Sequence, residues 1–193
     1  MRLFVGVELD EALRTACAAA AQNLQQRLRD ARVTLTARWV PEQNLHVTLW
    51  FLGNLDDDRA SEVVRALRSD WDVSAFSITV SGAGSFPPQR PPSILWLGVS
   101  DGAAALAELH RELANRLVPL GFEPERRPYH PHISIARVKD ADRAVPRKLG
   151  SILDAAASQP GSGLIRSIAL FQSHVSSAGA RYVPLLRVPL KAC

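Results

Sequence analysis

The feature that most restricts the fold of this 193-residue chain is a pair of short segments that recur, in the same order, in its two halves. In the first half, Leu-Phe-Val-Gly-Val at 3–7 precedes His-Val-Thr-Leu at 46–49. In the second half, Leu-Trp-Leu-Gly-Val at 95–99 precedes His-Ile-Ser-Ile at 132–135. One short match would be unremarkable, but two in the same order predict a duplicated structural unit. A solenoid is excluded, because there are only two copies and their period is too long.

Hydrophobic periodicity predicts strands and helices in both halves. The predicted strands are 3–8, 37–40, 45–52, 73–81, 94–99, 131–138, 164–172 and 180–188, and the predicted helices are 10–29, 57–69, 102–117 and 144–157. This mixture predicts an α+β fold. We expect a bilobal, duplicated unit with an approximate two-fold, in which two antiparallel-type sheets face a central cleft.

A glycine- and proline-rich stretch at 82–92 predicts a loop and marks the boundary between the halves. We therefore expect a single bilobal domain over 1–193, with lobes near 1–85 and 93–193, and we leave open an exchange of terminal strands between them. The composition, 47% hydrophobic and 22% charged, is typical of a soluble globular protein. No apolar stretch is long enough to span a membrane, and two acids follow the first residues too soon for a signal peptide, so a cytoplasmic protein is expected. No long apolar surface stripe is left over, which favours a monomer.

Strand geometry predicts which side chains of the repeated motif face the cleft. Because successive side chains point to opposite faces of a sheet, His46 and Thr48 share one face. The apolar residues between them face a helix layer. The same reasoning places His132 and Ser134 together in the second copy. A two-fold relation between the copies would then bring two histidines and two hydroxyls together across the cleft.

Two imidazoles on either side of one substrate suit in-line attack at phosphorus, one accepting a proton from the attacking oxygen and the other donating to the leaving oxygen. A single His-x-Thr on a strand usually marks a structural histidine, but two at equivalent places favour a shared site. The sequence has no carboxylate cluster for a metal, no Walker loop and no dinucleotide fingerprint, so we expect neither metal nor cofactor. A zinc alternative using His130 and His132 lacks a third ligand.

The remaining titratable candidates have ordinary structural interpretations. His110 and His174 are expected to be surface or structural residues. Cys17 is predicted to be a core thiol and Cys193 a terminal thiol, since their spacing fits neither a zinc site nor a disulfide framework. The net charge of +4, carried mostly by arginine, raises the expectation of a phosphate-bearing partner only slightly.

The residues Asn-Leu-His-Val-Thr-Leu-Trp-Phe-Leu-Gly at 44–53 and Pro-His-Ile-Ser-Ile-Ala-Arg at 131–137 resemble the paired signatures of the two-histidine (2H) phosphoesterases. More narrowly, they resemble the LigT-like RNA 2′,3′-cyclic phosphodiesterases of bacteria and archaea, long called 2′-5′ RNA ligases. Segments 2–4, 39–41 and 95–99 fit the same family. The resemblance implies a LigT-like fold, an RNA substrate ending in a 2′,3′-cyclic phosphate, and opening of that phosphate to a 2′-phosphomonoester without a metal.

The same resemblance implies roles for individual residues. His46 would be the general acid toward the 3′ oxygen and His132 the general base toward water. Thr48 and Ser134 would bind phosphate oxygens; serine replaces the commoner threonine but keeps the hydroxyl. Arg137 would contact phosphate or substrate. Strict alternation sends Arg137 to the wrong face, and a bulge or an early end of the strand would remove this conflict.

Four aromatic residues are candidates for stacking on a terminal base. Phe4, Trp50 and Trp96 fall on the cleft face by alternation, and Tyr129 precedes the second motif. The alternative is that they only line the interface between the lobes.

Two other functions stay open from the sequence. One is a different 2H activity, either 2′-5′ RNA ligation or hydrolysis of small cyclic or 2′-5′-linked nucleotides. The other is a non-catalytic RNA-binding module. The presence of both histidines argues against the second, because a binding module needs aromatic and arginine side chains rather than two imidazoles.

Overall fold

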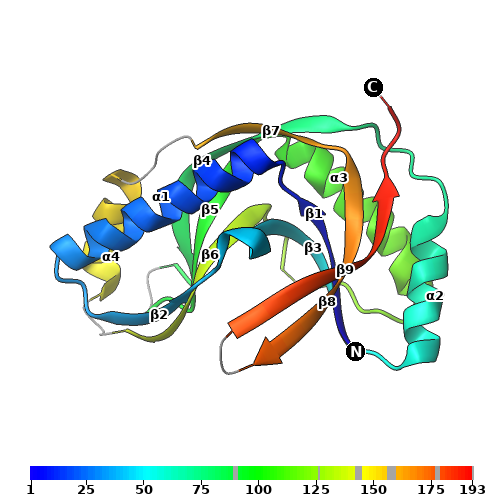
Figure 1. Ribbon diagram of the computed structural model, residues 1–193, viewed down its shortest axis with the longest axis horizontal. Helices are drawn as coiled ribbons and strands as arrows, with labels where there is room; N and C mark the ends of the chain where they lie inside the picture. The colour runs from blue at the N-terminus through cyan, green and yellow to red at the C-terminus, as the bar shows by residue number, and fades with distance from the viewer. Residues whose placement is uncertain (89–90, 126, 142–144, 156–159, 177–178, 193) are drawn as a thin grey trace.

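The computed structural model describes residues 1–88, 91–125, 127–141, 145–155, 160–176 and 179–192 (Figure 1). Strands alternate with helices in both halves of the chain, as the periodicity predicts. The elements in chain order are β1 (Arg2–Glu8), α1 (Glu11–Asp30), β2 (Leu35–Trp39), a 3-10 turn η1 (Glu42–Asn44), β3 (His46–Asn54), α2 (Asp57–Arg68), β4 (Phe76–Phe86), β5 (Ile94–Asp101), α3 (Ala103–Leu117), a second turn η2 (Val118–Leu120), β6 (His132–Ala141), α4 (Val145–Ala155), β7 (Gly161–Ile165), β8 (Ser167–Ser176) and β9 (Gly179–Pro189).

The strands form one curled sheet in the order β7-β4-β5-β6-β3-β1-β8-β9, with β2 pairing β6. All pairs between the named strands are antiparallel. The α+β class is therefore confirmed, but the two expected sheets are continuous with each other. They join where β3 meets β6, the two strands that begin at the histidines, through the register pair Val47–Ile133.

Elements cross between the two halves of the sheet. The C-terminal hairpin β8–β9 extends the first half beside β1, whereas β2 and β4, from the N-terminal half of the chain, pair with β6 and β5. Figure 1 shows the resulting curl, with α1 and α4 toward one end, α2 and α3 toward the other, and the β8–β9 hairpin below the middle. The two histidine strands lie at the centre of this arrangement.

The helices bury apolar stripes against the sheet. Helix α1 begins where the Asp10 carboxylate accepts a hydrogen bond from the Leu13 amide at 2.8 Å, the expected N-cap. Its buried stripe includes Cys17, which is a core thiol as predicted; Cys193 lies outside the described residues. Helices α2 and α3 confirm their predictions within a few residues. No helix in the described part of the chain is long and apolar enough to cross a bilayer.

Strand β4 departs from the sequence prediction, because it continues through the glycine-rich stretch to Phe86 instead of ending in a loop at residue 82. Gly84 pairs with Trp96 across the β4–β5 ladder. A Cβ at residue 84 would lie 2.1 Å from the Trp96 ring, so glycine is needed for the indole to lie across β4. The glycines thus allow close packing within the strand, and the ring of Trp96 is held in place next to the second histidine.

Candidate active site

The first histidine has a defined tautomer. His46 Nδ1 lies 2.7 Å from the backbone oxygen of Asn44, which can only accept, so Nδ1 donates. In the neutral ring Nε2 then carries the lone pair and lies 3.0 Å from Oγ1 of Thr48, whose hydroxyl donates to it. Histidine and threonine therefore lie on one face of β3, as the alternation predicts, and Nε2 is the nitrogen that can take up a proton.

The second histidine repeats this arrangement. His132 Nδ1 donates to the backbone oxygen of His130 at 2.7 Å, again two residues earlier in the chain. Nε2 of the neutral ring is then also a lone-pair nitrogen. The duplicated motif thus orients both imidazoles through an identical local hydrogen bond, on two neighbouring strands of one sheet.

Both rings hold protons weakly in the free protein. Burial, together with the charges of His132 and Arg137 and against the opposing effect of the Asn44 hydrogen bond, lowers the pKa of His46 to about 4. Burial, together with the charge of neighbouring His130, also lowers the pKa of His132. Two neutral imidazoles therefore lie on one face of the sheet at neutral pH, near enough that the charge of His132 affects His46. Negative charge placed between them would favour protonation.

A bulge in β6 decides where Arg137 points. The β5 pairing steps from Leu95–Ala136 to Trp96–Ser134, so β6 has one extra residue, Ile135. Ile135 and Ala136 are both fully buried, which interrupts the alternation and returns Arg137 to the face that carries His132 and Ser134. The bulge considered for Arg137 from the sequence is present. Arg137 is exposed on this face, and its charge acts on His46.

An equivalent bulge in β3 overturns the expectation for Trp50. The β1 pairing steps from Val5–Trp50 to Gly6–Thr48, so Leu49 is the extra residue. Trp50 therefore turns with Leu49 into the core under α3, 5% exposed, and does not face the cleft. Phe51 takes the cleft face instead and is 57% exposed. The error has one cause: alternation was extended across a bulge that the sequence does not reveal.

Tyr129 is also on the far side of the sheet from the histidines. Its ring stacks on His110 of α3 at 4.3 Å, His110 in turn stacks on Trp50 at 5.3 Å, and the Tyr129 hydroxyl donates to the backbone oxygen of Thr48 at 3.1 Å. The predicted cleft position of Tyr129 is therefore wrong. His110 has the structural role expected of it, between two aromatic rings.

Phe4 and Trp96 do lie on the histidine face. The Phe4 ring centroid is 4.8 Å from that of His46, but Phe171 and Tyr182 enclose Phe4, leaving it 4% exposed. The Trp96 ring lies 6.3 Å from that of His132. The repeat therefore places an aromatic ring beside each histidine: Phe4 beside His46 and Trp96 beside His132. Phe4 supports the ring of His46 and has no open face of its own.

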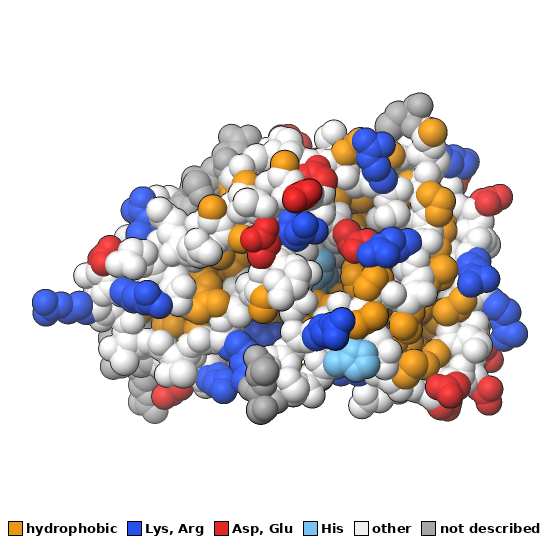
Figure 2. Space-filling view, viewed as in Figure 1, with side chains coloured by type: hydrophobic (Ala, Val, Ile, Leu, Met, Phe, Trp, Pro, Cys, Tyr) orange, Lys and Arg blue, Asp and Glu red, His pale blue; other side chains and the backbone are white. Residues whose placement is uncertain are grey.

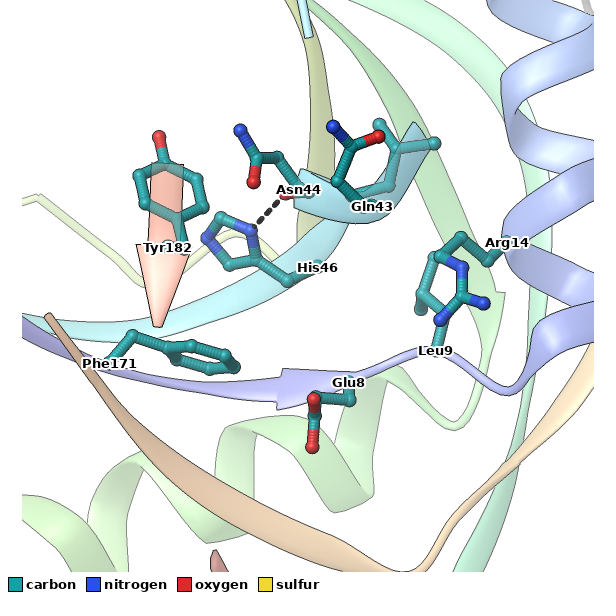
Figure 3. A pocket seen from close by; sticks show the side chains of 9 residues that line it. Glu8, Leu9, Arg14, Gln43, Asn44, His46, Phe171 and Tyr182 are labelled. Carbon is teal, nitrogen blue, oxygen red and sulfur yellow. Dashed lines mark hydrogen bonds between the residues drawn. The ribbon is translucent and has the colours of Figure 1, made fainter. Parts of the chain in front are cut away.

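A small pocket borders His46 and contains residues that the sequence analysis missed. It is lined by Glu8, Leu9, Arg14, Gln43, Asn44, Leu45, His46, Phe171 and Tyr182. Figure 3 shows Tyr182 and Phe171 on one side of the His46 ring and Arg14 across the pocket from it. Asn44, 5% exposed, donates from Nδ2 to the backbone oxygen of Ala180 at 2.6 Å and so connects the start of β3 to β9. Its burial and long-range partner are not visible in the sequence.

The surroundings of the site are charged and hollowed. Figure 2 shows a histidine deep near the middle of this face, with acidic and basic side chains around it. Glu8 and Arg187 form a two-bonded ion pair at 2.6 and 2.9 Å at the rim. Among the described residues no group of three or more His, Cys, Asp or Glu side chains is placed to hold a metal ion. The available chemistry is therefore that of two imidazoles, two hydroxyls and an arginine.

Comparisons with known proteins agree with this geometry. Residues 13–176 match the model of the 2′-5′ RNA ligase superfamily. An RNA 2′,3′-cyclic phosphodiesterase of Aeropyrum pernix is 34% identical over 164 residues, 84% of this chain and 92% of that protein. One of Methanothermobacter thermautotrophicus is 31% identical over 190 residues, 96% of each chain. E. coli LigT complexed with 3′-AMP has a similar structure, with a TM-score of 0.69, 26% identity, and coverage of 98% of this chain and 97% of that one.

The match covers both histidine motifs and both halves of the curled sheet, and the similarity extends over nearly the whole length of the relatives. The chain belongs to the 2′-5′ RNA ligase superfamily.

Proposed function

We propose that this protein hydrolyses the 2′,3′-cyclic phosphate at the end of an RNA strand to a 2′-phosphomonoester. The observation that carries the proposal is the pair His46 and His132, held in the same tautomer on adjacent strands. Relatives over 30% identical that are RNA 2′,3′-cyclic phosphodiesterases support it.

In this mechanism His132 Nε2 accepts a proton from water as the water oxygen bonds to phosphorus. The bond from phosphorus to the 3′ oxygen breaks, and that oxygen takes a proton from Nε2 of His46. His46 is neutral in the free protein, so it acquires its proton with the substrate, whose anionic phosphate stabilises the imidazolium. The hydroxyls of Thr48 and Ser134 and the guanidinium of Arg137 bind the non-bridging oxygens.

The surroundings of the two rings support this division of roles. His46 is enclosed by Phe4, Phe171 and Tyr182, which suits a group that delivers a proton to the substrate itself. His132 lies beside exposed His130, where water reaches it more easily. We further propose that the whole chain acts as one domain, because neither half of the sheet supplies both histidines. A cytoplasmic location and a monomeric state stay predictions.

A second candidate is 2′-5′ ligation at the same site, favoured by the superfamily match alone. It uses the same two imidazoles in the same direction: the 5′-hydroxyl of a second strand replaces water, gives its proton to His132 and bonds to phosphorus, while the 3′ oxygen leaves with a proton from His46. Incubating cyclic-phosphate RNA with a 5′-hydroxyl acceptor and measuring joined product against hydrolysis separates the two activities.

The test of the proposed function is turnover of a short RNA ending in a 2′,3′-cyclic phosphate, with EDTA present. Wild type is expected to yield a 2′-phosphate, and His46→Ala and His132→Ala are each expected to lose about a hundredfold or more, because each removes an acid–base group. His174→Ala, an exposed histidine on β8, is the matched control and should keep full activity. An inactive wild type, a 3′-phosphate product, or activity lost only on chelation would refute the mechanism.

A further inference from the structure

The pocket beside His46 contains an arginine that has no anion of its own. Arg14, from the first turns of α1, lines this pocket together with His46, and Figure 3 shows the two side chains on opposite sides of it. Arg14 is half-buried, and within the described part of the chain its buried Nε has no hydrogen-bond partner. None of the ion pairs found among the described residues includes Arg14. Because a guanidinium partly removed from water is costly without a partner, Arg14 is suited to an anion that arrives with a ligand.

The carboxylates near Arg14 have other partners. Glu8 lines the same pocket, but it forms two hydrogen bonds with Arg187, at 2.6 and 2.9 Å. Asp10, one helical turn before Arg14, accepts hydrogen bonds from two backbone amides, one in α1 and one in β7, at 2.8 and 3.0 Å. Glu42 accepts a hydrogen bond at 2.6 Å from the hydroxyl of the threonine that follows Arg14. These hydrogen bonds hold the carboxylates in place and leave Arg14 for a ligand.

The position of Arg14 relative to Arg137 suggests what this anion is. Strand β3 lies between β6, which carries Arg137, and β1, after which α1 begins. The pocket is lined by residues of β1, β8 and β9, so Arg14 approaches His46 from the side opposite to Arg137. An anion bound by Arg14 would therefore lie next to the group held at His46, but apart from the phosphate contacted by Arg137. The nearest second anion on an RNA strand is the phosphodiester that precedes the terminal nucleotide, and the planar fork of arginine suits its oxygens.

We propose that Arg14 binds the phosphodiester immediately before the terminal nucleotide, so that the protein prefers an RNA strand to a single nucleoside cyclic phosphate. The identity of this ligand rests on the proposed function. The two imidazoles and Arg137 act at the terminal phosphate, which a strand and a single nucleotide share, so they do not distinguish the two. Arg14 makes the distinction, because only a strand carries the second phosphate. Loss of a hydrogen bond between charged groups lowers kcat/KM roughly tenfold to a hundredfold.

The test compares three substrates: adenosine 2′,3′-cyclic phosphate, the dinucleotide ApA ending in the same cyclic phosphate, and that dinucleotide with a neutral methylphosphonate in place of its internal phosphodiester. In wild type, kcat/KM for the phosphodiester dinucleotide is expected to exceed that of either other substrate by about tenfold or more. Arg14→Met keeps an apolar stem without the charge and should reduce this advantage to about twofold or less, whereas Arg14→Lys should keep part of it. Arg27→Met is the matched control, since Arg27 is exposed on the same helix and bonded to Asn23, and should keep the full advantage.

A binding measurement separates this inference from the proposed function. The dissociation constants of the two dinucleotides, each ending in a 2′-deoxy-3′-phosphate that cannot cyclise, are measured for the same proteins. If no substrate is turned over but wild type prefers the phosphodiester dinucleotide and Arg14→Met does not, the proposed function fails and the Arg14 site stands. If turnover is normal but Arg14→Met keeps the advantage, or wild type treats phosphodiester and methylphosphonate alike, the Arg14 site is refuted. An equal loss on all three substrates, as a defect in folding or in the position of His46 would give, refutes it as well.

Discussion

At His46 and His132 a backbone carbonyl two residues earlier in the chain determines which ring nitrogen bears the proton. This hydrogen bond is local, so it was copied with the motif and does not depend on the rest of the fold. The environment of each ring does depend on the fold. His46 packs against three aromatic rings, whereas His132 lies beside the rings of Phe86 and Trp96 and borders the exposed side chain of His130. The same local hydrogen bond is thus found in two different environments.

The lowered histidine pKa values predict how stability depends on pH. Burial lowers the pKa of His46 to about 4 and lowers those of His110 and His132 as well. In the unfolded chain these rings bind protons near pH 6.5, so the unfolded state holds more protons in the window between about 6.5 and 4. The free energy of unfolding is therefore expected to fall as the pH falls through this window.

The measurement is urea unfolding of wild type and His46→Gln at pH 7 and pH 4.5. The glutamine variant is expected to lose less stability between the two pH values, because it cannot take up the proton. His174→Gln, which changes an exposed histidine, should follow wild type. Equal losses for His46→Gln and wild type would show that this ring does not titrate differently on unfolding.

The start of strand β3 is held in place by Asn44. At its start, the Asn44 side-chain amide donates a hydrogen bond to the Ala180 carbonyl of β9, while the Asn44 backbone carbonyl accepts one from His46 Nδ1. The same residue therefore connects the hairpin that carries Tyr182 to the ring that Tyr182 contacts at 5.2 Å. A change at residue 44 is expected to affect the orientation of His46 through the backbone, without contacting the substrate.

Asn44→Ala is expected to lower kcat more than it raises KM, and to lower the unfolding free energy by about 1–3 kcal/mol, because the buried Asn44 amide no longer binds the part-buried Ala180 carbonyl. The control is Thr79→Val, the other buried polar side chain of the described core, which loses its hydrogen bond to Ser162. Thr79→Val should lose stability and keep its kcat. If both variants keep kcat, Asn44 only stabilises the fold.

The pattern of successes and errors at this scale has physical causes. Alternation places His46 with Thr48 and His132 with Ser134 correctly, because no bulge lies between the members of either pair. It fails at Trp50, one residue past the extra residue of β3. Tyr129 could not be placed, because its position depends on His110 of a distant helix. Phe171 and Tyr182 were missed for the same reason, since they reach His46 through pairing with β1 and across the hairpin.

For the molecule as a whole, the resemblance and the repeat predicted an α+β fold with two related halves, which the curled sheet confirms. The order of strands could not be read from the sequence, because β2 pairs with β6 and the β8–β9 hairpin extends the sheet beside β1, each far in the chain from its partner. The net charge of +4 is modest, but Arg137 lies directly opposite Arg38 across β2 and β6. Two cations on one corner of the histidine face are suited to a polyanion.

This arrangement predicts that the salt dependence of RNA affinity comes in part from Arg137. RNA affinity is expected to fall as salt rises, and Arg137→Gln should reduce the slope of log K against log salt concentration by about 0.7, the value for one phosphate contact on a single strand. Arg111→Gln, an exposed arginine on α3 that pairs with Glu108, should leave the slope unchanged. The check is a salt titration of RNA binding for the three proteins. Equal slopes would remove Arg137 from the phosphate contacts.

The two bulges also bear on the direction in which an RNA strand can enter the cleft. A cleft with perfect two-fold symmetry would accept an RNA end equally well in two opposed directions, and only half of the encounters would align the bond to be broken with the proper proton donor. The residue after each bulge is free of the core, so its chemistry could diverge without disturbing either imidazole. With phenylalanine in one copy and arginine in the other, the two sides of the duplicated site differ, so a strand entering it would meet different side chains in the two directions.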